Sequence, residues 1–526
     1  MGQKYGIGEQ DFKTLREYGN VYIDKTHYIP MLLDQRFYFL CRPRRFGKSL
    51  LLSTLEQFFL GNKEVFKGLE IYDYNWDWVE YPVIKISFAQ GAFSKSGGLG
   101  DRIDSIIKRA EDRYKVKGEG VTIPRRFESI LSQISNKVGK EVVILVDEYE
   151  KPLLDSYGEE IFESNRKDLS EFYSVLKDNT EKIRFLFITG VTRFGHLNIF
   201  SGLNNLIDIS LDPEYTGICG ITEEELKRNL QSGVEEFSAN NGLCYEEALE
   251  ELKRYYDGYH FSENLTDIYN PFSLLRCLSS GRISDAWANS GSSRFILSLL
   301  KNRNFDISTI DDLYVSGKLL LGIDSDFMDP VPLLYQSGYL TIKSYNRQRR
   351  VYHLGIPNQE VREDFYESLI PYYLNASGRF SINDAFTLAE YIKDGKADRL
   401  MNWLQSFFAR ISYNTKFKYI EFENERDFQF VIGAIIALVS SLDNIQFEQE
   451  TSQGRIDILL RTEKYIYIFE FKLDNDAIVA LEQINSKNYA LPWIADSREV
   501  IKIGVAFSAE QRRIVDYKIE KEHAGV

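Results

Sequence analysis

Residues 37–61 read FYFLCRPRRFGKSLLLSTLEQFFLG, and this stretch decides the fold of the first part of the chain. Its hydrophobic start, 37–41, predicts a buried strand, and the Gly47-Lys48-Ser49 triplet opens an amphipathic helix after a tight basic loop. A P-loop requires a strand, a loop and a helix in this order, because the loop N–H groups and the helix N-terminus attract phosphate together. The stretch therefore predicts a nucleotide-binding α/β domain.

The residue types of the loop have separate chemical tasks. Gly47 lets the backbone approach phosphate, Lys48 is expected to reach the β- and γ-phosphates of ATP, and the Ser49 hydroxyl is expected to ligate Mg²⁺. The first glycine of GxxxxGK[ST] is replaced by Arg42, so the entry turn must differ. The predicted ATP-binding residues of this segment are Arg44, Arg45, Phe46, Gly47, Lys48, Ser49 and Leu50. An ordinary helix N-terminus can also carry a GK[ST] triplet, so the context matters.

Two later hydrophobic runs end in polar residues that suit the same site. VVILVDEYEKPL (142–153) predicts a buried strand that ends in Asp147, which would hold Mg²⁺, and Glu148, which would polarise the attacking water. IRFLFITGVTRFG ends in Thr192 and Arg193, which are expected to contact the γ-phosphate. The carboxyl ends of parallel strands meet at one sheet edge, where ligands bind. The alternative is a strand followed by a solvated acidic turn.

Around this loop, short β-branched or aromatic runs alternate with amphipathic helical stretches, which is typical of a parallel sheet covered by helices. The expected strands are 37–41, 83–88, 142–146, 185–189 and 206–210. Helical patterns dominate afterwards, and Thr222 and Glu225 form a capping box there. In 337–356, two alternating segments flank an arginine-rich turn and predict a β-hairpin that would suit the wing of a winged-helix unit.

A second group of acids occurs near the C-terminus. The order there is a helix (423–442), a strand, a hairpin GRIDILLRTEKYIYIFEFK (454–472) and a further helix. If Leu460 pairs with Tyr465 across the hairpin, Asp457 lies opposite Ile468 and diagonal to Glu470. Because residues i and i+2 share a sheet face, Asp457, Glu470 and Lys472 would then project together.

These residue types fit metal-assisted hydrolysis. Two carboxylates, Asp457 and Glu470, can share a Mg²⁺ or Mn²⁺ ion that activates water, and Glu425 from the preceding helix could complete the metal shell. The Lys472 ammonium could orient the water or stabilise developing charge. The alternative is that Glu470 and Lys472 form a cross-strand ion pair on a solvated face.

Seven segments resemble one protein family. VYIDKTHYI, FLCRPRRFGKSLLLSTL, VDEYEKPLL, ITGVTRFG, RYYDGYHF, YNPFSLL and LYQSGYLTI follow each other in order across most of residues 5–360 and look like the bacterial AAA-ATPase-like family. The resemblance implies a P-loop ATPase core, a helical and winged-helix-like middle and a C-terminal PD-(D/E)XK nuclease-superfamily domain. In this family RPRRFGKS is the usual form of the loop, and Gln483 resembles a glutamine often found near the nuclease-type site.

We therefore expect four parts in an α/β protein. They are a P-loop ATPase domain at 1–212, a helical and winged-helix-like region at 213–360, a helical linker at 361–415 and a nuclease-type domain at 416–526. The leading hypothesis is an enzyme in which ATP binding or hydrolysis governs a metal-dependent nuclease acting on DNA or RNA. The rivals are a nucleotide-switched regulatory or binding protein with a non-cleaving nuclease-like domain, and an ATPase that uses this domain as a protein-interaction surface.

The composition of the chain limits which binding partners are expected. A net charge of −14 would repel a polyanion, so contact with DNA or RNA must rely on local basic patches. Arg347, Arg349 and Arg350 at the predicted hairpin tip form such a patch, although charged tips are usually just solvated. Four cysteines without CxxC spacing, and the polar start of the chain, predict a cytoplasmic protein without membrane contact. Oligomerisation is left open.

Overall fold

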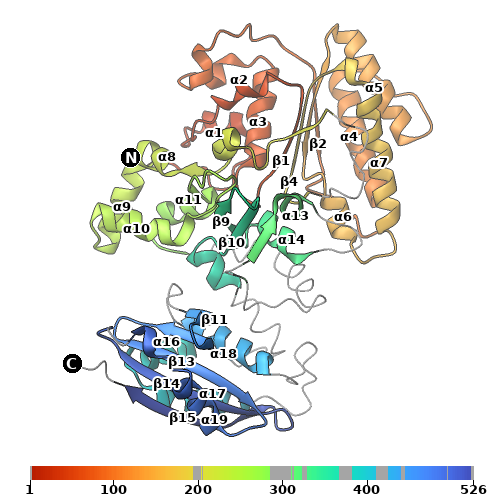
Figure 1. Ribbon diagram of the computed structural model, residues 1–526. Helices are drawn as coiled ribbons and strands as arrows, with labels where there is room; N and C mark the ends of the chain where they lie inside the picture. The colour runs from red at the N-terminus through yellow and green to blue at the C-terminus, as the bar shows by residue number, and fades with distance from the viewer. Residues whose placement is uncertain are drawn as a thin grey trace. The chain divides into compact units, whose positions relative to one another are not determined.

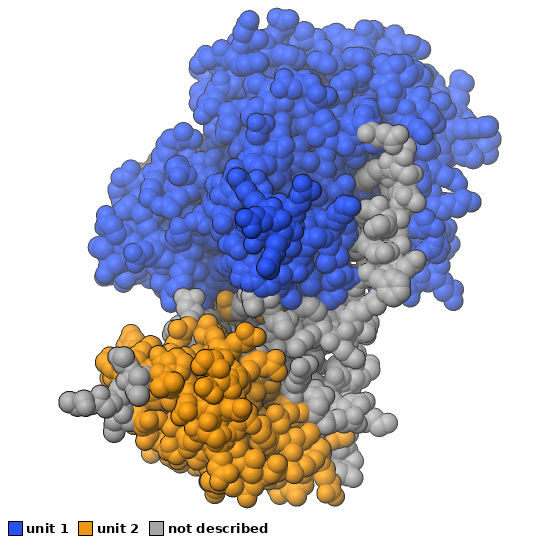
Figure 2. Space-filling view, in the orientation of Figure 1, with its two compact units in different colours: residues 1–292, 312–360 blue, residues 293–311, 361–526 orange. Residues whose placement is uncertain are grey.

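The computed structural model describes residues 3–193, 203, 205–284, 310, 313–322, 329–365, 382–409, 425–439, 445–493 and 496–522. The chain divides into two compact units, which Figure 2 shows in different colours. Unit 1 comprises residues 1–292 and 312–360, and unit 2 comprises 293–311 and 361–526. The predicted helical linker, 361–415, lies partly outside the described residues. None of the described helices is long and apolar enough to cross a membrane.

A five-stranded parallel sheet forms the core of unit 1, in the order β2-β3-β4-β1-β5. Its strands are β1 (Phe37–Cys41), β2 (Val83–Ser87), β3 (Val142–Asp147), β4 (Ile183–Gly190) and β5 (Ile207–Asp208). All five predicted strands are present, although β5 is shorter than expected. Every residue of β1 and β3 is buried, because helices cover both faces of the sheet.

The helices around this sheet lie in two groups, with α1, α2 and α3 on one side and α4, α5 and α7 on the other (Figure 1). Their bounds are α1 (Phe12–Glu17), α2 (Tyr28–Leu32), α3 (Lys48–Phe59), α4 (Gly98–Tyr114), α5 (Ile123–Val138), α6 (Lys151–Ser156) and α7 (Phe162–Asp178). The chain reaches α3 directly from β1, so the P-loop lies at the carboxyl edge of the sheet. This confirms the predicted α/β class.

The remainder of unit 1 has a helical part and a small antiparallel sheet. The helical part contains β6 (Ile221–Thr222), α8 (Glu223–Asn229), α9 (Gln231–Asn241), α10 (Tyr245–Tyr256), β7 (Ile268–Tyr269) and α11 (Pro271–Ser280). These helices share one apolar core, and α8 begins with the predicted capping box of Thr222 and Glu225. The second part contains β8 (Leu313–Ser316), α13 (Gly317–Leu321), α14 (Pro330–Ser337), β9 (Thr341–Asn346) and β10 (Val351–Gly355). β9 and β10 form the predicted hairpin, and β8 pairs with β10.

Unit 2 has a five-stranded mixed sheet in the order β11-β12-β13-β14-β15. Its elements are α16 (Ile382–Lys393), α17 (Ala397–Ala409), α18 (Glu425–Val439), β11 (Ile445–Thr451), β12 (Gly454–Arg461), β13 (Tyr465–Leu473), α19 (Ala477–Ser486), β14 (Glu499–Ser508) and β15 (Arg513–Glu522). The predicted succession of helix, strand, hairpin and helix is present. β13 pairs in parallel with β14, which places β13 at the centre of the sheet and buries its middle residues.

Candidate functional sites

The backbone of the P-loop forms a tight turn before α3. Gly47 precedes α3 with φ 94°, and Arg45 has φ 66°, so two left-handed residues shape the turn. Lys48 Nζ donates to the carbonyl oxygens of Arg42 and Pro43, each at 2.8 Å. Burial lowers the pKa of Lys48. The lysine therefore lies across the loop on neutral partners, which an anionic phosphate can replace.

Arg42, which replaces the first glycine of the P-loop pattern, turns into the protein interior. Its guanidinium donates to the carbonyl oxygens of Cys41 at 2.9 Å, Ser210 at 2.7 Å and Tyr215 at 3.1 Å. It also lies 4.3 Å from the centre of the Phe261 ring. The side chain is 1% exposed. Arg42 thus ties the end of β1 to the segment after β5, and it is a structural residue of the loop's entry turn.

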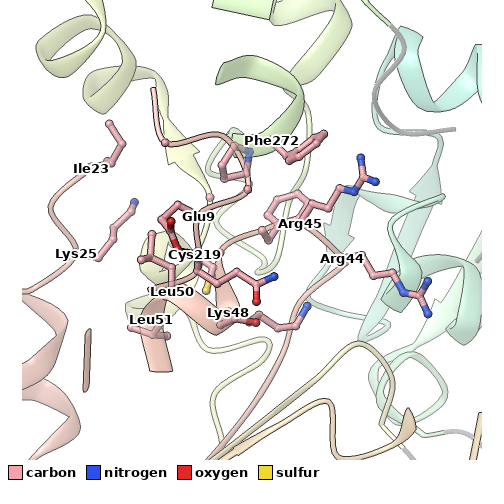
Figure 3. Close-up of a pocket in the computed structure, with 18 of the residues that line it drawn as sticks. Glu9, Ile23, Lys25, Arg44, Arg45, Lys48, Leu50, Leu51, Cys219 and Phe272 are labelled. Carbon is pink, nitrogen blue, oxygen red and sulfur yellow. Dashed lines mark hydrogen bonds between the residues drawn. The ribbon is translucent and has the colours of Figure 1, made fainter. Parts of the chain in front are cut away.

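A cavity of about 550 Å³ opens in front of this loop. All seven loop residues predicted to bind ATP, 44–50, line it, together with parts of the N-terminal segment and of the helical region. Figure 3 shows Ile23 and Lys25 across the cavity from Arg44, and Arg45 beside Phe272. The Phe46 ring packs inward against Tyr259, so only its position in the loop serves the site. The cavity volume is in the range of small-molecule sites.

Asp147 faces the P-loop from the end of β3. Its Oδ2 accepts a hydrogen bond from the Ser49 hydroxyl at 2.6 Å, and its Oδ1 accepts one from the Thr189 hydroxyl at 2.9 Å. The carboxylate is therefore fixed by β4 on one side and by α3 on the other. Ser49 and Asp147, the two predicted Mg²⁺ ligands of this site, are in direct contact. Hard oxygen donors in this arrangement fit the metal.

Glu148 lines the same cavity with φ 53°, a left-handed conformation that sets it apart from the strand before it. Burial and the neighbouring Asp147 raise the pKa of Glu148. A carboxylate of raised pKa beside a phosphate site is suited to accept a proton near neutral pH. The sequence-based assignment of Glu148 as the general base is therefore compatible with its surroundings, and it stays a prediction.

Two residues on β4's side of the site were missed in the sequence analysis. Glu150 is 2% exposed, accepts from the Val191 N–H at 2.7 Å through Oε1, and has no hydrogen-bond partner at Oε2. Burial raises its pKa to about 7. Gly190 leaves room for Glu150, because an added Cβ would lie 2.4 Å from Oε2. The third acid in VDEYE was a signal for Glu150. Thr189 gave no such signal, because it ends the run FLFIT (185–189), whose other residues are all hydrophobic.

The predicted γ-phosphate contacts, Thr192 and Arg193, lie elsewhere in this structure. Neither lines the cavity, although their neighbour Val191 does. Arg193 pairs with Asp208 at 2.7 Å and its backbone N–H donates to Gln336 at 2.9 Å. Thr192 is buried behind the end of β4, where its carbonyl accepts from Tyr149. Their contact with the γ-phosphate stays a prediction, and it would require a rearrangement of their side chains or of the loop.

In unit 2, the predicted register of the hairpin is wrong by two residues. Leu460 pairs with Tyr467, and Ile458 pairs with Phe469, so Asp457 falls opposite Glu470. The reason is the turn, which Thr462 closes with two hydrogen bonds. The Thr462 N–H donates to the Tyr465 carbonyl, and the Thr462 Oγ1 accepts from the Tyr465 N–H. Because a shift of two preserves the sheet face, the predicted meeting of Asp457 with Glu470 survives the error.

Glu470 lies at the centre of this cluster and is 2% exposed. Its Oε1 accepts from Lys472 Nζ at 3.0 Å and from the Gln483 amide, whereas its buried Oε2 has no hydrogen-bond partner. Burial and then the charge of Asp457 raise the pKa of Glu470 to about 8. Burial of Lys472 lowers its pKa, but the negative charges of the acids around it outweigh burial, so the pKa of Lys472 is raised. The unsatisfied oxygen and the adjacent Asp457 suit a divalent cation.

Glu425 joins the cluster from α18. Its Oε1 lies 3.8 Å from Lys472 Nζ, and its Oε2 accepts from the Leu473 N–H at 3.2 Å. Asp457 Oδ2 accepts from the Phe471 N–H at 2.8 Å. Within the described part of the chain, no group of three or more His, Cys, Asp or Glu side chains is arranged to hold a metal ion. Asp457 and Glu470 thus form a pair, and Glu425 as a third ligand stays a prediction.

Comparison with known proteins identifies the families of both domains. The family model described as "Predicted AAA-ATPase" matches residues 5–200, and that of the "PD-(D/E)XK nuclease superfamily" matches residues 423–517. The "Uncharacterized protein in vnfD 5'region" of Azotobacter chroococcum mcd 1 is 32% identical over 527 residues, which cover 98% of this chain and 99% of that protein.

The fold and these two matches define the class of the protein, a predicted AAA-ATPase with a nuclease-superfamily domain. The chain belongs to the AAA-ATPase-like family, with a predicted AAA-ATPase domain at 5–200 and a PD-(D/E)XK nuclease-superfamily domain at 423–517. Both domains have enzymatic potential. The first implies nucleotide as a ligand, and the second implies nucleic acid.

Proposed function

We propose that this chain is an ATP-dependent nuclease that binds and hydrolyses ATP in unit 1 and cleaves DNA or RNA in unit 2. The observation that carries the proposal is that each unit holds a carboxylate pair beside a lysine, in chemically different settings. In unit 1 the lysine rests on carbonyl oxygens. In unit 2 it rests on carboxylates. The first arrangement suits an anionic ligand, and the second suits a cation.

In unit 1, Lys48 exchanges the carbonyls of Arg42 and Pro43 for phosphate oxygens of ATP. Ser49 and Asp147 would hold the Mg²⁺ ion that accompanies the nucleotide. Glu148 accepts a proton from the attacking water, which its raised pKa favours. Thr189 keeps the Asp147 carboxylate in position through the 2.9 Å bond.

In unit 2, Asp457 and Glu470 would hold Mg²⁺ or Mn²⁺, which supplies a bound water of lowered pKa. Lys472 places positive charge where the phosphodiester develops negative charge, and it contacts Glu470 at 3.0 Å. Gln483 fixes the orientation of the Glu470 carboxylate from α19. The tight packing of Glu470 against its own chain keeps bulk water away from the acid.

A cleavage assay with Mg²⁺ or Mn²⁺, run with and without ATP, tests the proposal. Wild type should cleave DNA or RNA, and ATP should change the rate. Asp457→Asn should abolish cleavage, whereas Glu148→Gln should keep ATP binding, lose ATP hydrolysis and alter only the ATP effect. Glu160→Gln, an exposed acid on the same unit as Glu148, is the control. If the Asp457→Asn variant cleaves as fast as wild type, the nuclease assignment is refuted.

A second candidate is a nucleotide-switched binding protein with a non-cleaving nuclease-like domain. Lys472 and Gln483 already occupy one oxygen of Glu470, which favours this alternative. It predicts ATP-dependent binding of nucleic acid with no cleavage in either metal. Calorimetry with Mn²⁺ separates the two, because the nuclease requires cation binding that Asp457→Asn removes.

A further inference from the structure

The hairpin of β9 and β10 concentrates positive charge in an acidic protein. Residues 341–357 contain Lys343, Arg347, Arg349 and Arg350 and no Asp or Glu, in a chain of net charge −14. Residues 313–322, which form β8 and α13, add Lys318 and again no acid. These segments belong to one three-stranded sheet and the helix beside it. Residues 313–322 and 341–357 together therefore carry five cations and no acid, and three of the cations lie in the loop 347–350.

The three arginines lie together in the loop that joins the two strands. Asn346 pairs with Val351, so residues 347–350 form the loop itself. Its backbone is held by a bond from the Arg349 N–H to Asn346 Oδ1 at 3.0 Å. The side chain of Arg347 is 82% exposed, and the other two arginines are also exposed. The hairpin thus presents its guanidinium groups to solvent on an ordered turn.

Among the described residues, one acid forms an ion pair with this loop. Glu263 Oε1 lies 3.7 Å from Arg347, with the arginine mostly in solvent. Ion pairs that are exposed in this way contribute little to stability, because water screens them. Lys343 lies on β9, outside the loop, and donates to the Pro357 carbonyl at 3.4 Å. Most of the positive charge of the loop is therefore available to an anionic ligand.

The sheet next to the loop carries an exposed aromatic ring. Tyr314 of β8 is 65% exposed and stacks on His353 of β10, with ring centres 4.7 Å apart and an interplanar angle of 16°. The register puts Ser316 and Ser344 on the same face, and both are exposed. In Figure 1, β9 and β10 are drawn in strong green beside α13 and α14. A largely polar face that exposes the Tyr314 ring therefore lies beside the cationic loop.

We propose that this face and the 347–350 loop bind a single-stranded segment of nucleic acid. The arginines contact phosphates, and Tyr314, backed by His353, stacks on an unpaired base. A duplex would use the arginines alone, whereas an exposed ring on a sheet is suited to an unstacked base. The inference rests on the proposed function only in taking nucleic acid as the ligand, because the surface itself lies in unit 1 and not in the nuclease-type domain.

Fluorescence anisotropy of the full chain with a labelled 25-nucleotide single strand tests this inference. Measurements in EDTA without ATP remove cleavage, so the result does not depend on nuclease activity. The Arg347, Arg349, Arg350→Ala triple variant should weaken binding about tenfold or more and reduce the salt slope by about 2, since each phosphate contact contributes about 0.7. The control removes three exposed cations from the same unit by the Lys108, Arg109, Lys117→Ala triple substitution and should change binding less than about twofold.

Tyr314→Ala provides the second measurement. It should weaken single-strand binding about fivefold or more and leave the salt slope unchanged, because stacking contributes about 1–3 kcal/mol and releases no counterions. Equal losses in the two triple variants would overturn the assignment of the hairpin. Duplex binding as tight as single-strand binding, with no effect of Tyr314→Ala, would overturn the single-strand assignment. If binding behaves as expected but no cleavage occurs, the nuclease proposal fails and this one stands.

Discussion

The two sites of this protein use lysine in opposite ways. Lys48 of unit 1 is held by two carbonyl oxygens, which orient its ammonium without neutralising it. Lys472 of unit 2 contacts the carboxyl groups of Glu470 and Glu425, and Asp457 adds a third acid nearby. The first site therefore has a cation ready for an anion. The second has more acid than base, and its net charge favours a divalent cation.

The two sites also differ in the volume that is open to a ligand. The P-loop opens on a cavity of about 550 Å³, large enough for a nucleotide. Glu470 is packed into its sheet, with one oxygen bonded and the other buried without a partner. A divalent ion needs several oxygen ligands but little space, whereas a triphosphate needs an open volume. Similar side chains thus serve different ligands because backbone and packing differ around them.

The largest effect should follow from changing Lys472. Lys472→Met should reduce cleavage about 1000-fold, because the charge that stabilises the transition state is lost. Mn²⁺ affinity should rise several-fold, because the lysine no longer competes for Glu470. Calorimetry at a pH at which Glu470 is ionised in both proteins measures the affinity, because loss of Lys472 raises the Glu470 pKa above its wild-type value of about 8. Glu482→Gln, an exposed acid on α19, is the control. A fall in Mn²⁺ affinity would show that Lys472 supports the cation and does not compete with it.

The second effect concerns Lys48. Lys48→Ala should weaken binding of a non-hydrolysable ATP analogue about 100-fold, or about 3 kcal/mol, because a charge-assisted contact to phosphate is lost. Fluorescence titration measures this change, and Lys67→Ala, an exposed lysine on the same unit, is the control. If both variants bind equally well, the cavity in front of the P-loop is not the nucleotide site.

How far the sequence predicts each site depends on how local the determinants are. Gly47, Lys48 and Ser49 are adjacent in the chain, and they follow a strand whose burial is evident from composition. Asp147 was predictable because it ends the most hydrophobic run of the domain. These residues meet because parallel strands end at one sheet edge.

Features that depend on side-chain packing could not be predicted in this way. The inward turn of Arg42 requires the carbonyls of Ser210 and Tyr215, which are about 170 residues away in the chain. The hairpin register of unit 2 depends on how Thr462 closes the turn. Arg193 was expected at the phosphate site but pairs with Asp208, because β5 lies beside β1. Partners far away in the chain decide the position of Arg42, whereas the register depends on one side-chain hydrogen bond within the turn.

The third effect tests the entry turn of the P-loop. Arg42→Gly restores the usual glycine but removes the bonds to three buried carbonyls, so it should lower the stability of unit 1 by about 2–3 kcal/mol. Arg42→Lys should lose less, because one ammonium can keep part of these contacts. Thermal unfolding monitored by intrinsic fluorescence checks both. A glycine variant that is as stable as wild type and binds ATP more tightly would mean that Arg42 serves the ligand and not the fold.

The smallest effect concerns Glu150, the buried acid behind the P-loop site. Its pKa of about 7 in the folded protein lies above the ordinary glutamate pKa of 4.5, so the folded state binds the proton more tightly than the unfolded state. The stability from this group is complete below about pH 4.5 and is lost as pH rises through 7. Glu150→Gln keeps an acceptor for Val191 but cannot ionise, so its stability relative to wild type should increase by about 2 kcal/mol between pH 5 and pH 8.5. Thermal midpoints at several pH values measure the difference, with Glu160→Gln as the exposed control. Because Glu470 titrates in both proteins, its contribution cancels, and a pH-independent difference would mean that Glu150 is ionised and paired in the folded protein.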